Sequence, residues 1–160
     1  MENILEKEPV KRVKEFIIKF DPKLKVLGLD TTARTAKDAA ESLGCEVGAI
    51  VKSLVFRADD SFLICLVAGD KRCSLNKLKK ILQKKDVCMA NADEVKINTG
   101  FSIGGVAPIA HKKNLDILID KSLDRFQYVF GAAGHPNCVF KISYNELIKI
   151  SEGHEKEISE

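Results

Sequence analysis

The chain has 160 residues, which is the size of one domain of roughly 100 to 200 residues and excludes a multidomain enzyme. Hydrophobic residues make up 45% and charged residues 31%, a globular composition that excludes a disordered or fibrous chain. The formal net charge is +3, although the last ten residues hold four glutamates and one lysine. The rest of the chain is therefore more basic, which permits a polyanionic partner without requiring one.

The sequence predicts a soluble, cytoplasmic protein without a membrane segment. No apolar run approaches the roughly 18 to 20 residues that span a bilayer. The start of the chain, Met1-Glu2-Asn3, also lacks a basic stretch followed by an apolar one, so no targeting segment is expected.

Neither cysteines nor histidines predict a metal site. The five cysteines include no C-x-x-C pair, so neither a disulfide framework nor a zinc ribbon is indicated. His111, His135 and His154 lack metal-ligand spacing among themselves or with the cysteines. We expect no metal and no cofactor.

Apolar spacing and capping residues predict the elements of the first half. An amphipathic helix covers residues 10–20 and a short strand covers 24–29. Thr35 begins a helix that Gly44 ends. The apolar runs 51–57 and 62–68 predict a hairpin of two central strands.

The same signals continue in the second half. They predict a helix over 74–82, a strand over 87–90, a helix that Asn91 and Glu94 cap, strands over 115–119, 127–130 and 138–142, and a last helix over 143–150. About seven strands and five helices in irregular alternation are typical of a mixed α+β domain rather than a doubly wound sheet. We divide the chain into an N-terminal helix (1–23), one domain (24–150) and an acidic tail (151–160).

Residues 99–111 hold too many glycines, and a proline, for regular structure. Gly104, Gly105 and Pro108 allow backbone N–H groups to converge on an anion or oxyanion, although a simple tight turn has the same composition. Neither a nucleotide P-loop nor a G-x-G-x-x-G pattern is present.

The stretch Gly100-Phe101-Ser102-Ile103-Gly104 formally matches the nucleophile elbow of serine hydrolases. That motif requires a helix directly after the serine, which Gly105 and Pro108 forbid. The alternative interpretation of this stretch is a serine hydrolase, with Asp120 and His135 as the partners of the serine.

Two single side chains are candidates for a pocket. Lys52 interrupts an apolar run, and burying an ammonium group is costly unless it is paired or faces a cavity. His135 lies in a glycine-rich turn between strands. The alternatives are a lysine at the wet end of a strand and a surface turn histidine.

The order of several segments resembles the YbaK-type aminoacyl-tRNA deacylases, which are free-standing relatives of the editing (insertion) domain of bacterial prolyl-tRNA synthetase. The resemblance covers residues 24–150. It rests on the stretches 32–36, 39–41, 43–44, 50–54 (Ile-Val-Lys-Ser-Leu), 68–70, 99–101, 104–108 (Gly-Gly-Val-Ala-Pro) and 133–136.

The resemblance implies a mixed sheet curled into a partly open barrel, and hydrolysis of a small amino acid wrongly attached to tRNA, most often proline tRNA. It implies that Lys52 binds the terminal phosphate or 2′-hydroxyl of the tRNA. The implied catalytic loop, whose N–H groups receive the ester carbonyl, consists of Gly104, Gly105, Val106, Ala107 and Pro108. The predicted substrate-binding residues are His135, Gly134, Phe56, Ile103 and Thr99.

The expected partner is the acceptor end of an aminoacyl-tRNA. Aromatic residues are only 6% of the chain and Trp is absent, so an extended base-stacking platform is not expected. Candidate phosphate contacts are Lys71, Arg72, Lys77, Lys79, Lys80, Lys84, Lys85, Lys112 and Lys113. We expect a monomer that works alone or with prolyl-tRNA synthetase; the alternative is a non-catalytic module that binds tRNA or this synthetase.

Overall fold

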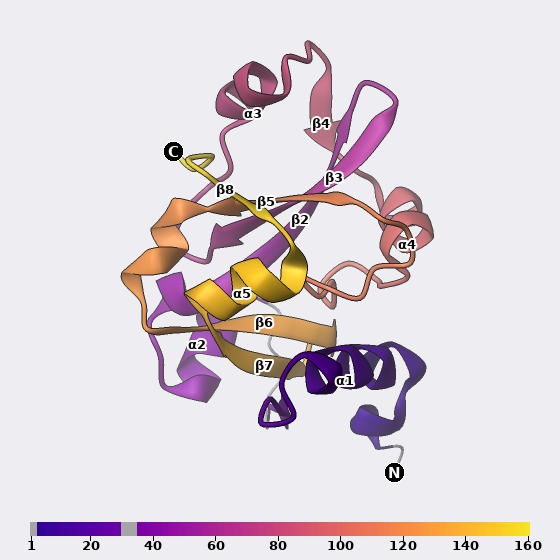
Figure 1. The fold of residues 1–160 in the computed structure, drawn as a ribbon, viewed down its shortest axis with the longest axis vertical. Helices are drawn as coiled ribbons and strands as arrows, with labels where there is room; N and C mark the ends of the chain where they lie inside the picture. Colours follow the sequence, from indigo (N-terminus) through magenta and orange to yellow (C-terminus); the bar gives the residue numbers. More distant parts are fainter. Residues whose placement is uncertain (1–2, 30–34) are drawn as a thin grey trace.

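In the part of the chain that the structure describes, eight strands form one mixed sheet with five α-helices around it (Figure 1). The computed structural model describes residues 3–29 and 35–160. The strands are β1 (Val26–Gly28), β2 (Ile50–Ala58), β3 (Ser61–Ala68), β4 (Val87–Met89), β5 (Asp116–Asp120), β6 (Tyr128–His135), β7 (Cys138–Ser143) and β8 (His154–Lys156). The helices are α1 (Glu8–Phe20), α2 (Ala36–Leu43), α3 (Leu75–Leu82), α4 (Ala92–Thr99) and α5 (Tyr144–Ser151).

The strand order is β1-β7-β6-β2-β3-β5-β8, with β4 paired to β2 beside this path. The hairpin β2–β3 is antiparallel and central, whereas β6 on β2, β5 on β3 and β8 on β5 are parallel. The path stays open between β1 and β8, and α5 lies between β5–β8 and β6–β7 in Figure 1. The predicted mixed α+β domain with a partly open barrel is confirmed.

The predicted helix ends are confirmed by their caps. The side chains of Thr35, Ser74, Asn91 and Ser143 each accept a hydrogen bond from the N–H three residues later, and Asn91 forms a full capping box with Glu94. Gly44 and Gly100 end their helices at φ values of 69° and 79°, in the left-handed region that favours glycine.

The sheet differs from the prediction in two ways: β6 is longer than expected, and the tail adds a strand. Strand β6 continues to His135, which therefore ends a strand and does not lie in the turn. The acidic tail contributes β8, and Ile158 beyond it is fully buried. A three-residue strand with one nearby apolar side chain produces no detectable alternation, so sequence periodicity misses it. Thr32, Ala33 and Arg34, which contribute to the sequence resemblance, lie outside the described residues.

Helix α1 belongs to the core of the domain. Its residues Val10, Val13 and Ile17 are fully buried in the main hydrophobic cluster, together with residues of β3, β6 and β7. None of the helices that the structure describes is long and apolar enough to cross a membrane.

Helix α1 also anchors both ends of the glycine loop 99–111. The Arg12 guanidinium donates to the carbonyl of Thr99 (3.0 Å) and to that of Ala110 (3.0 Å), and lies 4.4 Å from the ring centre of Phe101. A Cβ at Gly100 would lie 2.6 Å from the Arg12 Nη2 atom. The glycine at position 100 is therefore required by its backbone angle and by this close approach.

A buried histidine holds the middle of the loop. His111 Nε2 lies 2.7 Å from the carbonyl oxygen of Ala107, so the nitrogen carries the hydrogen and donates it. Burial, together with the charge of Arg12, lowers the pKa of His111 to about 4, although the bond to Ala107 acts in the opposite direction. The imidazole is therefore neutral at pH 7.

Replacing Arg12 by alanine removes two charged hydrogen bonds and the contact with Phe101. We expect Arg12→Ala to lower the free energy of unfolding by about 2 kcal/mol and to speed amide hydrogen exchange in the loop 99–111, as measured by urea denaturation and mass spectrometry. Lys14→Ala, at an exposed position of α1, is the matched control. Unchanged exchange in the loop would show that Arg12 does not anchor it.

The His111 imidazole makes stability depend on pH in a defined window. Because its pKa is about 4 in the folded protein and near 6.5 in the unfolded chain, the unfolded chain takes up the proton first as the pH falls. Up to about 3 kcal/mol of stability, present above pH 6.5, should be lost between pH 6.5 and 4. The pKa values of Asp70 and Asp120 are lowered, so their contributions are lost at lower pH.

His111→Gln keeps an N–H donor and does not titrate. Denaturation curves at a series of pH values should show a flatter dependence for this variant than for the wild type between pH 6.5 and 4. Parallel curves for the two proteins would contradict the assignment.

Candidate functional site

A cavity of about 400 Å³ lies beside the central strand β2. Its lining is mostly apolar and comes from five parts of the fold: α2, β2, the segment from β4 to α4, the glycine loop, and β6–β7. The lining residues are Thr35, Ala36, Ala39, Ile50, Val51, Lys52, Ser53, Leu54, Val55, Met89, Ala90, Val95, Ile103, Gly104, Val106, Phe130, Ala132, Pro136 and Val139. The volume lies in the range of small-ligand pockets.

The position of the cavity follows from the pairing of β2. Strand β3 pairs with β2 along its whole length, but two different strands share the other edge. Strand β6 pairs with Ile50 and Val51, whereas β4 pairs with residues 56–58. Residues 52–55 lie between these two neighbours, and the cavity is located there.

The glycine loop forms the wall of the cavity opposite β2. Gly104 and Val106 line it directly, and no residue in the described ranges accepts a hydrogen bond from their N–H groups. The Gly105 N–H is already used within the loop, where it donates to the Ser102 carbonyl at 3.0 Å. Ile103 is 62% exposed and therefore lies at the rim.

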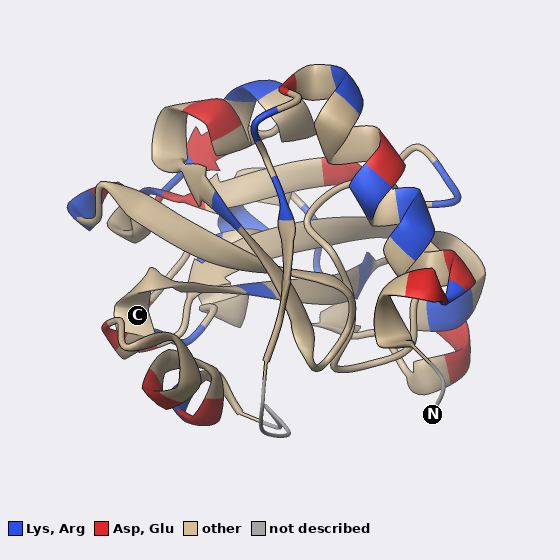
Figure 2. Ribbon diagram, turned by 90° about the horizontal axis from the view of Figure 1, so that it is seen from below, with Lys and Arg blue, Asp and Glu red and all other residues tan. Residues whose placement is uncertain are grey.

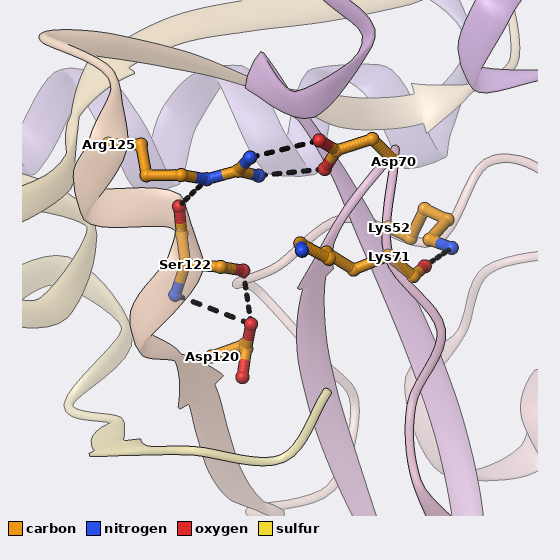
Figure 3. A network of polar contacts seen from close by, with 6 residues as sticks. All are labelled: Lys52, Asp70, Lys71, Asp120, Ser122 and Arg125. Carbon is orange, nitrogen blue, oxygen red and sulfur yellow. Dashed lines mark hydrogen bonds and ion pairs between the residues drawn. The ribbon is translucent and has the colours of Figure 1, made fainter. Parts of the chain in front are cut away.

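Lys52 is half-buried at the boundary between this cavity and a second hollow. Its Nζ donates a hydrogen bond to the main-chain carbonyl of Lys71, in the segment that follows β3 (Figure 3). Burial lowers the pKa of Lys52, and the carboxylate of Asp70 opposes that effect. Among the described residues, the ammonium group thus has one hydrogen-bond partner, the Lys71 carbonyl, and Lys52 lines both hollows.

The segment that holds Lys52 is itself fixed by a polar network (Figure 3). Asp70 receives two hydrogen bonds from Arg125, at 2.7 and 3.0 Å, which lower the pKa of Asp70. Arg125 also donates to the Ser122 carbonyl at 2.7 Å, and the Ser122 hydroxyl donates to Asp120. Asp120 then accepts from the N–H groups of Ile158 and Ser159.

The second hollow, of about 640 Å³, lies on the other side of Lys52 and is more cationic. Arg72, Lys79 and Lys52 line it, together with Phe56 and Glu160. Several of the helices carry both basic and acidic residues, as Figure 2 shows. Of the predicted phosphate contacts, Arg72 and Lys79 are thus the two that share a hollow with Lys52.

His135 and Gly134 lie behind the glycine loop, close to the cavity but outside its lining. A Cβ at Gly105 would lie 3.0 Å from the Cα of His135, so the loop and this turn are in direct backbone contact. The Asn137 N–H donates to His135 Nδ1 at 3.0 Å. Burial lowers the pKa of His135 further below neutrality.

The other predicted site residues lie outside the cavity lining. Thr99 is fully buried, and its hydroxyl donates to the Val95 carbonyl at 2.7 Å. Phe56 is 2% exposed and belongs to a separate apolar cluster under the second hollow. Ala107 and Pro108 are buried supports of the loop, and Pro108 packs against Gly131 of β6.

The nucleophile-elbow alternative fails in the structure. Gly100 is the C-cap of α4, so Ser102 follows a helix rather than a strand, and no helix follows it. Asp120 bonds to Ser122 and to the tail, away from Ser102. Across residues 3–29 and 35–160, no group of three His, Cys, Asp or Glu side chains could hold a metal ion.

Sequence reasoning missed much of the cavity wall. The small residues Ala36 and Ala39 of α2 were recognised only as a close-packing face, and Phe130 and Val139 only as strand residues. Their sequence positions are far apart, and only the fold brings them together. A polar residue inside an apolar strand, Ser53, was the available signal for the β2 wall.

Comparisons with known proteins agree with this geometry. The proline–tRNA ligase of Caldicellulosiruptor bescii is 31% identical over 115 residues, which are 71% of this chain and 20% of the ligase. The chain therefore spans about a fifth of that enzyme. The protein EbsC of Enterococcus faecalis, named as a proposed Cys-tRNA(Pro)/Cys-tRNA(Cys) deacylase, is 26% identical over 126 residues, 78% of this chain and 77% of EbsC.

A solved structure is similar over nearly the whole chain. It is described as a proposed trans-editing enzyme for prolyl tRNA synthetase, and it has a TM-score of 0.91, 34% sequence identity and a coverage of 96% of this chain and 98% of its own. Residues 30–150 match the family described as the aminoacyl-tRNA editing domain. Because this match includes the β2 strand, the glycine loop and the turn at His135, the chain belongs to the aminoacyl-tRNA editing domain family.

Proposed function

We propose that this editing domain acts in trans, as an aminoacyl-tRNA deacylase that removes a small, wrongly attached amino acid from proline tRNA. The observation that carries the proposal is the mostly apolar cavity between β2 and the glycine loop, with Lys52 as the cationic residue of its lining. The likeness to the proposed trans-editing enzyme, over 98% of that structure, supports action as a separate protein. EbsC supports a small substrate such as a cysteinyl ester.

The reaction requires no protein nucleophile, because an aminoacyl ester is already activated. A water oxygen forms a bond to the ester carbonyl carbon, the bond from that carbon to the ribose oxygen breaks, and a proton passes to the ribose oxygen. The site needs to position the ester and stabilise the oxyanion that develops. The N–H groups of Gly104 and Val106 are the proposed oxyanion donors, since neither donates to any residue that the structure describes.

The N–H groups of Gly104 and Val106 are then held in place by the neighbouring residues Gly105, Ala107 and Pro108. Gly105 packs on the backbone of Gly134 and His135 at the end of β6, Pro108 packs on Gly131, and the Ala107 carbonyl accepts from His111. We assign His135 and Gly134 the role of framing the loop from behind. Preorganised donors cost no reorganisation during the reaction, which is the condition for strong stabilisation of an oxyanion.

Lys52 is proposed to bind the phosphate or the 2′-hydroxyl of the terminal adenosine. It lies at the boundary between the two hollows, so an aminoacyl group in the first places the nucleotide in the second. Arg72 and Lys79 line this second hollow, where they would neutralise phosphates without reading sequence. A monomer in the cytoplasm, working alone or with prolyl-tRNA synthetase, is the arrangement we propose.

Selectivity is proposed to come mainly from size and shape. One methylene changes binding by only about 1 to 3 kcal/mol, whereas steric exclusion of the proline ring has a larger effect. The cavity walls of Val51, Val55 and Val106 are buried and belong to the main core. A rigid wall of this kind suits exclusion by shape.

Deacylation of a charged panel tests the function and the role of Lys52. Proline tRNA carrying alanine, cysteine, serine, 2-aminobutyrate or proline should lose one small noncognate residue and keep proline. We expect Lys52→Ala to lower kcat/KM by at least about tenfold, as for loss of one charged hydrogen bond, while Lys149→Ala on α5, an exposed control, stays at the wild-type level.

An active Lys52→Ala variant would remove Lys52 from the mechanism. If no ester is hydrolysed but tRNA still binds in a salt-dependent manner, the non-catalytic binding module is correct.

The second hollow generates a separate prediction. Arg72→Ala and Lys79→Ala should raise KM for the charged tRNA about threefold to tenfold with little change in kcat, and each should reduce the slope of log KM against log salt. Lys141→Ala is the control. Lys141, on β7, lies over the ring of Tyr128 on β6 and is not among the described residues that line the second hollow. Equal effects of all three substitutions on KM would indicate general electrostatic attraction of the tRNA and no nucleotide site in the second hollow.

A further inference from the structure

Ser53 occupies an unusual place on β2. It lies between Val51 and Val55, which are buried in the main core, and all three line the cavity. Side chains two residues apart share one face of a strand, so the Ser53 hydroxyl points to the same side as the two valines. Its Oγ atom is buried and has no hydrogen-bond partner among residues 3–29 and 35–160.

The main-chain groups of Ser53 also face the gap in the sheet. The Ile50 carbonyl accepts from Gly69 N–H at 2.8 Å, on the β3 side, whereas the Val55 carbonyl accepts from Ala90 N–H at 3.0 Å, on the opposite side. These groups alternate in direction along a strand with an antiparallel neighbour. The N–H and C=O of Ser53 therefore point away from β3, to the edge that neither β6 nor β4 covers.

A buried hydroxyl without a partner is costly, and such atoms in native proteins call for an explanation. The chemistry of the cavity supplies one. Among the described residues that line it, Thr35, Lys52 and Ser53 carry the polar side chains, and none of these described residues has a carboxylate. The Thr35 hydroxyl already accepts from the Asp38 N–H as a helix cap.

An aminoacyl ester brings two polar groups into this cavity, the ester carbonyl and the α-ammonium. The Lys52 cation repels the α-ammonium group of the ester. The Ser53 hydroxyl and the Ser53 main-chain carbonyl are acceptors that this group can bind instead. We infer that Ser53 binds the α-ammonium group of the aminoacyl ester through its Oγ and its main-chain carbonyl. This inference rests on the proposed function, and it orients the ester so that its carbonyl faces Gly104 and Val106.

The test compares two esters of the same tRNA. Alanyl proline tRNA carries the α-ammonium, and its lactyl counterpart, made by nitrous acid deamination, carries a hydroxyl in its place. Loss of a hydrogen bond to a charged group predicts that Ser53→Ala lowers kcat/KM for the alanyl ester by at least about tenfold. For the lactyl ester the change should stay below about threefold, and Ser53→Thr, which keeps the hydroxyl, should stay close to the wild type on both esters.

Stability provides an independent readout. Because no described residue forms a hydrogen bond with the Ser53 hydroxyl, Ser53→Ala should keep or raise the thermal unfolding midpoint, so lost activity would not be a folding defect. Equal losses on the two esters, or no loss on either, would overturn the inference while leaving the deacylase function in place. A wild-type protein that hydrolyses neither these esters nor any in the panel would overturn the proposed function and the inference together.

Discussion

The divergence of β6 and β4 along one edge of β2 is the constraint on which the rest of the site depends. The nine-residue central strand pairs there with β6 only at Ile50 and Val51 and with β4 only at residues 56–58, so neither covers residues 52–55. A gap in a sheet leaves main-chain polar groups without strand partners, which proteins normally avoid. In this fold, α2 and the glycine loop enclose the gap, so the exposed edge becomes the floor of a cavity.

The cationic and the apolar halves of the site are held by different means. The apolar half rests on core packing, since the cavity valines belong to the same cluster as α1 and β7. The cationic half rests on polar bonds that lead from Lys52 through the segment after β3 to Arg125, Asp120 and the tail (Figure 3). The tail therefore contributes to the position of Lys52, and its residue Glu160 also lines the second hollow.

Local signals made most of the fold predictable. Capping pairs at Asn91 and Ser143 act over three residues, and glycine C-caps act within one turn, so each can be identified without tertiary information. Strand β8 could not be predicted, because its side chains are exposed and its pairing with β5 is a long-range contact. The role of Arg12 as an anchor of the glycine loop could not be predicted either, since a charged residue on an amphipathic helix normally faces solvent.

The site, like the fold, was predictable only where residue type or resemblance marks a residue. Lys52, Gly104, Ile103 and Val106 stand out by residue type or by resemblance, and the structure places all four at the cavity. Phe56 and Thr99 do not line it, because β4 covers the edge of β2 at Phe56, which packs in a separate apolar cluster, and the helix end buries Thr99. Walls from α2, β6 and β7 depend on topology, which a linear pattern does not contain.

The link between Arg12 and the glycine loop has a consequence for the order of folding. The two bonds join positions 87 and 98 residues apart, and such distant contacts form only after the intervening chain has compacted. Helix α1 is the first helix of the chain, yet it docks beside β6, which follows the loop. We therefore expect the loop to become ordered late, after the sheet has assembled, so that the cavity is shaped at the end of folding rather than inherited from a local turn.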